Sequence, residues 1–269
     1  MTDDSPQSLF ERGGDHTFVP TAAAAGPWHP DILHGGAVGA LLAGLLEDPE
    51  QVLVRVLVEL LGPVPSQPLT AEVGPVEGGR RVVRQAAELR AGDRPVARAG
   101  ALRMRRAALD LPPAATEHQI AFDPTTVPDL TRPNRHALKD VGWESFDSLA
   151  MATRWDEPGP ETPHRCRFWL KLLLPVVPDR PASTVENVVA AADYGGGGTS
   201  GRLGFRSWTF MNADLVVSLS RPPARDWVGI ETDGLLGRTG TGQSVATIHD
   251  AEGPLGQSSQ SILVEPRAN

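Results

Sequence analysis

The stretch WHPDILHGGAVGALLAGLLED, residues 28–48, decides how the first half of this chain is expected to fold. Five apolar residues recur in it at intervals of three and four, which is typical of a helix with one buried face: Val38, Leu41, Leu42, Leu45 and Leu46. The acidic pair and proline at 47–49 end the pattern. We therefore expect a buried helix that begins directly after His34-Gly35-Gly36.

Gly35 and Gly36 stand at the entrance of this expected helix, where missing side chains leave backbone N–H groups accessible. Such groups at the positive end of a helix favour a carbonyl or phosphate oxygen. One interpretation is a substrate-binding or oxyanion site, in which His34 orients the loop or titrates near neutral pH. The other is a tight glycine turn with His34 packed beside the helix end.

The 269 residues, of which 40% are hydrophobic and 22% charged, indicate a globular protein of one or two domains. No apolar run reaches the roughly 18 to 20 residues of a membrane span, and the first residues lack the basic start of a secretory signal. We therefore expect a cytoplasmic protein. The formal net charge of −8 argues against a nucleic-acid partner.

Cysteine and histidine usage gives no indication of a metal site or a cofactor. The single cysteine, Cys166, excludes an internal disulfide and a multi-thiolate metal site, and we expect a buried thiol that packs as a small hydrophobic residue. No pair of histidines has metal-ligand spacing. Residues 194–201 satisfy G-x-G-x-x-G, but they follow an expected helix instead of a strand, so we expect no nucleotide there.

Two similar halves are expected, at 1–106 and 141–269, separated by a proline-rich linker at 107–140. Apolar, β-branched segments alternate with Gly and Pro turns in both halves, which is typical of antiparallel sheets. The expected strands cover 52–61, 69–76, 81–89 and 95–104, then 166–174, 208–219, 227–232, 243–249 and 255–264, with a second helix over 182–193.

A shift of 159 positions lays the first half on the second without a gap from 62–63 to 95–96, and we favour a duplication. A helix followed by a long antiparallel sheet, twice, predicts an α+β fold in which each helix lies across its own sheet. One sheet face would stay exposed unless the two sheets join at an edge or pack together. The two halves are therefore expected to depend on each other.

Several segments resemble the TesB-like acyl-CoA thioesterases: His34-Gly35-Gly36, GPVP at 62–65, WTFMNADLVVSLSRP at 208–222, DWVG at 226–229 and GQSSQSILV at 256–264. The resemblance implies a double hotdog fold, with two tandem units in which an antiparallel sheet wraps around a central helix. It further implies hydrolysis of an acyl-CoA to a free acid and CoA by direct attack of water, without a covalent intermediate.

The same resemblance implies an Asp, a Thr or Ser and a Gln that together hold the attacking water. Asp214 and Gln260 match the Asp and the Gln by position. The alternatives are a surface Asp at a strand start and an exposed Gln. By spacing from Trp227, Leu235 takes the place of the hydroxyl. Three neighbouring hydroxyls are therefore candidates for this role: Thr232, Thr239 and Thr241.

The 159-residue shift favours a single site, because it lays Arg55 under Asp214 and Ala101 under Gln260. Asp193, at the end of the second expected helix, is a reserve base, since an acid lies on the corresponding helix in some single hotdog thioesterases. Its alternative role is to bind the glycine-rich loop that follows. The first half offers Ala43 nine residues after His34, so it has no acid there.

Two other functions remain open from the sequence. A hotdog hydratase or dehydratase would want an Asp and a His in one site, but His249 and Asp250 are adjacent and would face opposite sides of a strand. A non-catalytic acyl-CoA or acyl-ligand binding protein is favoured by Leu235 at the hydroxyl position. Exposed sheet edges would also favour a homo-oligomer.

Overall fold

The computed structural model describes residues 5–116, 141–155, 166–197, 203 and 207–267. The first part contains β1 (Phe10–Arg12), β2 (Thr17–Pro20), η1 (Ala22–Ala24), α1 (Gly35–Leu46), β3 (Gln51–Leu60), β4 (Leu69–Val73), β5 (Glu77–Gly78), β6 (Val82–Ala91), β7 (Arg94–Arg105) and α2 (Pro113–Thr116). The second contains the π-helical turn η4 (Phe146–Ala150), β8 (Met151–Trp155), β9 (Cys166–Leu172), α3 (Thr184–Ala192), η5 (Asp193–Gly196), β10 (Trp208–Asn212), β11 (Asp214–Leu219), β12 (Val228–Leu236), β13 (Thr241–Asp250) and β14 (Gly253–Pro266).

Within the described residues the strands form one antiparallel sheet in the order β1-β2-β4-β6-β7-β3-β11-β14-β13-β12-β9-β8, with β10 also on β14 and β5 on β6. The strands before α2 are contiguous in this order, and so are those after it. The two groups meet where β3 pairs with β11, over Arg55–Glu59 and Asp214–Ser218. The sheets thus join edge to edge, which leaves no open edge between them.

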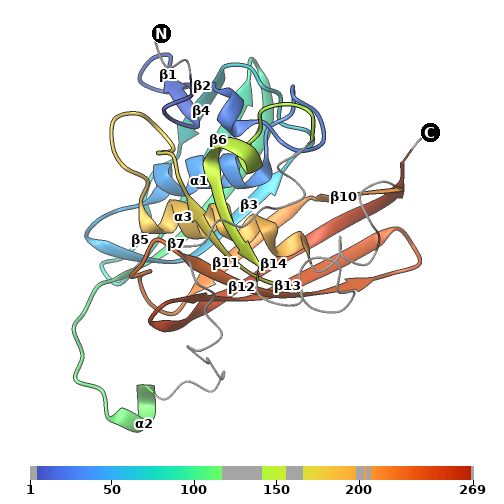
Figure 1. Cartoon of the computed structure of the whole chain (residues 1–269). Helices are drawn as coiled ribbons and strands as arrows, with labels where there is room; N and C mark the ends of the chain where they lie inside the picture. The colour runs from blue at the N-terminus through green and yellow to red at the C-terminus, as the bar shows by residue number, and fades with distance from the viewer. Residues whose placement is uncertain (1–4, 117–140, 156–165, 198–202, 204–206, 268–269) are drawn as a thin grey trace.

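Helices α1 and α3 pack side by side, with the strands of the sheet around them (Figure 1). Val38, Leu42 and Leu46 of α1 are fully buried, as the apolar pattern of residues 28–48 predicts. Val188 and Val189 of α3 are equally buried. The expected arrangement of two central helices against antiparallel sheets is therefore present.

The two helices run in opposite directions, and each end of one meets an end of the other. At one end, His34, the N-cap of α1, contacts Asp193, the C-cap of α3. At the other, the N-cap residue of α3, Ser183, donates a hydrogen bond to Glu47, the C-cap residue of α1. Because the helices are antiparallel, each pair of adjacent helix ends brings together one residue from the first half of the chain and one from the second.

The 159-residue shift matches the observed elements in the two sheets. It carries Val82–Ala91 (β6) onto Thr241–Asp250 (β13) and the start of β7 onto the start of β14. The division of the chain at 106–107 and 140–141 stays a prediction, because residues 117–140 of the expected linker lie outside the described residues. Helix α2, in the expected linker, projects away from the sheet in Figure 1.

One expected strand is wrong in a way that affects the site. Residues 208–219 were expected to form a single strand, but β10 ends at Asn212 and β11 begins at Asp214. The N–H of Ala213 between them donates to the carbonyl of Ser261, and the register against β14 shifts by one residue across this break. Since side chains alternate along a strand, a shift of one residue exchanges the two faces.

Smaller outcomes concern single residues. Cys166 is buried, as expected. Glu77 and Gly78, which lie between the expected strands at 69–76 and 81–89, form the short strand β5, and the N-terminal hairpin of β1 and β2 was not predicted. No helix in the described parts of the chain is long and apolar enough to span a membrane.

Candidate active site

His34 is the N-cap residue of α1 and is almost buried. Its Nδ1 accepts a hydrogen bond from the N–H of Gly36 at 3.0 Å. The ring packs against two aromatic side chains that also contact each other, with centroid distances of 4.6 Å to Phe146 and 5.4 Å to Tyr194. These contacts fix the plane of the imidazole, so that its nitrogens have defined neighbours.

The glycines that follow are required by the close approach of the end of α3. A Cβ atom at Gly35 would lie 2.9 Å from Oδ1 of Asp193, and one at Gly36 would lie 2.8 Å from the carbonyl oxygen of Ala190. Any larger residue would push the two helices apart. The glycine pair at the helix entrance therefore brings Asp193 against the first turn of α1.

The two glycine N–H groups have different partners. The prediction that both donate to a substrate oxygen is wrong for Gly36 in this structure, because its N–H is engaged by the side chain of His34. The N–H of Gly35 has no acceptor among the described residues, and Gly35 lines a cavity. Gly35 alone keeps the arrangement needed for an oxyanion donor.

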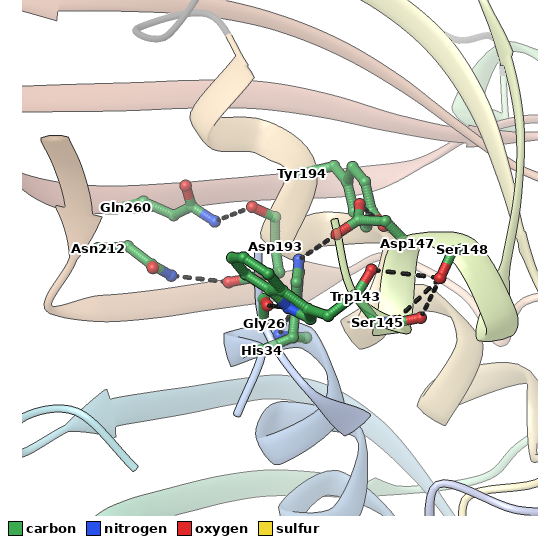
Figure 2. Close-up of polar contacts among 11 residues, drawn as sticks. Gly26, His34, Trp143, Ser145, Asp147, Ser148, Asp193, Tyr194, Asn212 and Gln260 are labelled. Carbon is green, nitrogen blue, oxygen red and sulfur yellow. Dashed lines mark hydrogen bonds and ion pairs between the residues drawn. The ribbon is translucent and has the colours of Figure 1, made fainter. Parts of the chain in front are cut away.

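Asp193 lies at the C-terminal end of α3, and its side chain is 7% exposed. Oδ1 accepts a hydrogen bond of 2.7 Å from Nδ2 of Asn212, the last residue of β10. Oδ2 lies 3.2 Å from Nδ1 of His34. The carboxylate is thus held from two sides, by one residue of each half, as Figure 2 shows.

Gln260 points inward from β14, and its side chain holds the end of α3 (Figure 2). Nε2 donates to the carbonyl oxygen of Asp193 at 2.9 Å and to that of Ala192 at 3.3 Å. Oε1 is buried and has no hydrogen-bond partner among the described residues. Gln260 therefore fixes the main chain that carries the Asp193 carboxylate.

Behind His34 lies a second carboxylate, Asp147 of η4, whose side chain is 1% exposed. Its Oδ1 accepts a hydrogen bond of 2.6 Å from the hydroxyl of Tyr194. Its Oδ2 faces Nε2 of His34 at 3.9 Å. The imidazole thus stands between two buried carboxylates, Asp147 and Asp193.

The protonation of this cluster follows from its charges. Burial opposes a charged imidazole, but the hydrogen bond to Asp193 and the charges of Asp147 and Asp193 outweigh it, so the pKa of His34 is raised above its usual value. Burial, together with the charge and hydrogen bond of Asp147, raises the pKa of the Tyr194 hydroxyl well above its usual value. Tyr194 therefore stays a protonated donor to Asp147 at neutral pH.

A cavity opens at the junction of the two halves, beside this cluster. Its polar end is formed by His34, Gly35, Asp193 and Asn212. Its remaining walls are mostly apolar, with side chains from both halves: Trp28, Ile32, Leu60, Val64, Met211 and Leu263. An apolar pocket with a few convergent polar groups is typical of a small-molecule site.

The predicted pair of Asp214 and Gln260 is not formed. The carboxylate of Asp214 accepts hydrogen bonds from the N–H of Ser261 at 2.7 Å and from its hydroxyl at 3.2 Å. Ser261 and Gln260 are consecutive on β14, so their side chains lie on opposite faces of the sheet. Asp214 lies on the outward face, whereas Gln260 and Asp193 lie inside. The break at Ala213 is the reason, because it turns Asn212 inward and Asp214 outward.

None of the three candidate hydroxyls lines the cavity. Thr232 is buried, and its Oγ1 donates to the carbonyl of Gly195 at 2.6 Å, which anchors η5. Thr239 and Thr241 are exposed residues at the turn between β12 and β13 and lie 3.2 Å apart, Oγ1 to Oγ1. Leu235, at the expected hydroxyl position, is 65% exposed.

Three residues of the site escaped the sequence analysis: Asn212, Asp147 and Tyr194. Asn212 lies within the segment 208–222 that carries the family resemblance, two residues before Asp214. Tyr194 directly follows the reserve base Asp193. Asp147 stands in no helix or strand pattern, so nothing in its neighbourhood signals a buried carboxylate.

His249 and Asp250 share no site, because Asp250 forms an ion pair with Arg221.

Comparisons with known proteins agree with this architecture. A family model described as the acyl-CoA thioesterase C-terminal domain matches residues 63–264. The structure is similar to the tesB protein of Mycobacterium avium subs paratuberculosis, at 18% identity and a TM-score of 0.67, with 96% of each chain covered. At these low identities the structural likeness shows a shared fold.

Two further solved structures are similar over nearly their whole length. Acyl-CoA thioesterase II TesB2 from Mycobacterium marinum is 14% identical, with a TM-score of 0.67 and coverage of 97% of this chain and 96% of that one. A hot dog fold protein of unknown function from Alicyclobacillus acidocaldarius is 15% identical, with a TM-score of 0.68 and coverage of 98% and 97%. Among curated protein sequences, none matches the chain.

Proposed function

The chain belongs to the acyl-CoA thioesterase family, and on that premise we propose that it cleaves an acyl-CoA by direct attack of a water held at Asp193. The resemblance to TesB-like thioesterases and the double hotdog fold are confirmed. Thioester hydrolysis is the activity of the family, and the water mechanism and its residues are our proposal. The observation that supports it best is the meeting of Gly35 and Asp193, one from each half, at the polar end of a single cavity.

Asp193 is the proposed general base. Its carboxylate lines the cavity, and the hydrogen bond from Asn212 fixes its orientation. A thioester is an activated acyl donor, so the enzyme has to aim a water, accept its proton and stabilise the developing oxyanion. We assign the first two tasks to Asp193, with Gln260 holding its main chain. The role of base that was predicted for Asp214 thus passes to Asp193, the predicted reserve.

The N–H of Gly35 is the proposed oxyanion donor. It belongs to the first turn of α1, where the helix dipole adds to the field of the N–H group. The Asp193 carboxylate lies where a Cβ atom of residue 35 would stand, so a carbonyl oxygen at Gly35 places its carbon next to water at Asp193. The acyl chain would then follow the apolar walls of the cavity, between Trp28 and Leu263.

A non-catalytic binding protein is the alternative that the sequence left open through Leu235. In our proposal Asp193 is the base, the N–H of Gly35 is the oxyanion donor, and the amide of Asn212 orients the base. Leu235 is exposed and lines no part of this cavity, so a missing hydroxyl at position 235 does not argue against catalysis. The cytoplasmic location and the homo-oligomer expected from the sequence stay predictions.

The experiment is release of CoA thiol from acyl-CoAs of graded length by wild type and Asp193→Asn. Loss of the base should lower kcat by about 100-fold to 10,000-fold. The matched control is Asp214→Asn, on the outward face of the sheet, which should keep wild-type kcat and KM. Wild-type activity in Asp193→Asn, or loss of activity in Asp214→Asn alone, would return the base to Asp214. Tight acyl-CoA binding by wild type without thiol release would favour the binding protein.

A further inference from the structure

Nδ1 of His34 has two neighbours that cannot both be satisfied in one protonation state. The N–H of Gly36, at 3.0 Å, needs an acceptor, whereas Oδ2 of Asp193, at 3.2 Å, needs a donor. A neutral ring with a bare Nδ1 accepts from Gly36, and a protonated Nδ1 donates to Asp193. The contact between His34 and Asp193 therefore has room for one proton, shared between Oδ2 and Nδ1.

The other ring nitrogen of His34, Nε2, also has a defined neighbour. In the neutral form that accepts from Gly36, the proton of His34 sits on Nε2, which faces Oδ2 of Asp147. Asp147 is a buried carboxylate held by the hydroxyl of Tyr194, and a buried charge of this kind is costly unless it is paired. Its position behind an imidazole favours the doubly protonated, positively charged ring.

Backbone hydrogen bonds tie the segments that carry His34 and Asp147 to two neighbouring residues, Ala24 and Ala25. The N–H of His34 donates to the carbonyl of Ala24, and the N–H of Phe146 donates to the carbonyl of Ala25. Ser145 and Ser148 form a capping box that closes the η4 turn. These hydrogen bonds of η4, the turn directly before β8, thus position Asp147 beside His34. The turn belongs to neither of the two central helices.

We infer that Asp147, held by Tyr194, is a positioning residue that acts through His34 on the proton taken up by Asp193. This inference rests on the proposed function. When water attacks the thioester carbon, one O–H bond breaks, the new C–O bond forms, and the proton passes to Asp193 and on to Nδ1 of His34. As the C–S bond breaks, the proton returns through Asp193 to the thiolate, which leaves free acid and CoA thiol.

Among the described residues, Asp147, Asp193 and Tyr194 are the charged or titratable groups that face His34. Asp147 comes from η4, Asp193 and Tyr194 come from the end of α3 and from η5, and the first turn of α1 carries no acidic residue. The pKa of His34, raised by both carboxylates against the effect of burial, agrees with a ring that accepts a proton readily. Removing the charge of Asp147 should lower that pKa, because one of the two carboxylates that favour the charged ring is lost.

The test is the pH profile of kcat for Asp147→Asn, with CoA release from an acyl-CoA as the assay. Since the neutral ring must accept the proton, activity should rise with pH through the pKa of His34. In Asp147→Asn this acid limb should move to lower pH by about one unit, the plateau should fall about tenfold, and KM should stay unchanged. A uniform loss at every pH, without a shift of the limb, would mean that Asp147 has only a structural role.

Tyr194→Phe is the second variant, and it keeps the test valid if Asp147→Asn does not fold. It retains the ring beside His34 and removes only the hydroxyl that holds Asp147, so the limb should shift the same way by a smaller amount; an unshifted limb overturns the inference. The ring-nitrogen NMR shifts of His34, assigned with His34→Gln, report its pKa without any activity. If Asp193→Asn keeps full activity, the proposed base is wrong; if it is inactive and the His34 titration is unchanged in Asp147→Asn, only the present inference fails.

Discussion

Asn212 supplies a side-chain hydrogen bond to the Asp193 carboxylate, whereas none of the three candidate hydroxyls lines the cavity. Its amide is the hydrogen-bond donor to Oδ1 of Asp193, at 2.7 Å, and it lines the cavity. The carboxylate therefore depends on Asn212 for its orientation in the cavity, and a hydrogen bond to a charged group contributes about 1.5 to 3 kcal/mol.

Replacing Asn212 should reduce the chemical step and leave substrate binding nearly unchanged. In Asn212→Ala we expect kcat to fall by about 10- to 100-fold, since the carboxylate loses its donor. Asn212→Thr keeps a donor on a residue suited to a strand and should retain more activity. Steady-state kinetics of both variants on one acyl-CoA measure this. An alanine variant as fast as wild type would show that Asp193 needs no donor from β10.

The assignment of the base shows what residue patterns can and cannot predict. His34, Gly35 and Gly36 were predicted from the helix entrance, and Gln260 from its place on the last strand, and all four lie at or next to the cluster. Asp214 matched the Asp of the family by position, yet it faces outward. Both acids were visible in the sequence. Asp214 is turned outward by the register change at Ala213, where its carboxylate accepts a hydrogen bond from the N–H of Ser261, and no local pattern signals that change.

At the scale of elements, the helix entrance carries a steric demand that can be tested. A Cβ atom at Gly36 would lie 2.8 Å from the carbonyl oxygen of Ala190 in α3, and backbone on both sides leaves little room for adjustment. Overpacking of this kind costs about 1 to 3 kcal/mol. The effect should be seen as a loss of unfolding free energy and of activity together, because the same contact sets the position of Asp193.

Gly36→Ala is the variant for this prediction, and Gly100→Ala is its matched control. Gly100 lies in β7, and a Cβ atom there would meet nothing within 4 Å. Urea unfolding should place Gly36→Ala about 1 to 3 kcal/mol below wild type and Gly100→Ala near wild type. Equal stability of the two variants would contradict the close packing of α1 on α3.

Helices and most strands were predictable because each carries its own periodic pattern. The stripe from Val38 to Leu46 gave α1, and the 159-residue shift related β6 to β13. The break between β10 and β11 has no such signal, since Ala213 fits an uninterrupted strand as well as a bulge. The hairpin of β1 and β2 is joined to the sheet by the pairing of β2 with β4, about 50 residues further along the chain, which a local pattern does not reveal.

At the scale of the whole molecule, the site exists only where the two halves meet. Gly35 and His34 belong to the first half, whereas Asp193, Asn212 and Asp147 belong to the second. The halves share the β3–β11 pairing and the contact between α1 and α3. A half on its own would expose the apolar side of its helix and an unpaired strand edge, both of which favour aggregation.

This division predicts how the chain should behave when it is cut. Residues 1–116 and 141–269, produced separately, should each lack a cooperative unfolding transition and release no thiol from acyl-CoA. Mixed or co-expressed, they should form a complex in which activity rises with fragment concentration, because the cut converts an intramolecular contact into an association. Size-exclusion chromatography and the thiol assay measure the two parts of this prediction. The matched control is the same mixture with Asp193→Asn in the second fragment, which should assemble without activity. An active fragment 141–269 on its own would contradict a site that needs the first turn of α1.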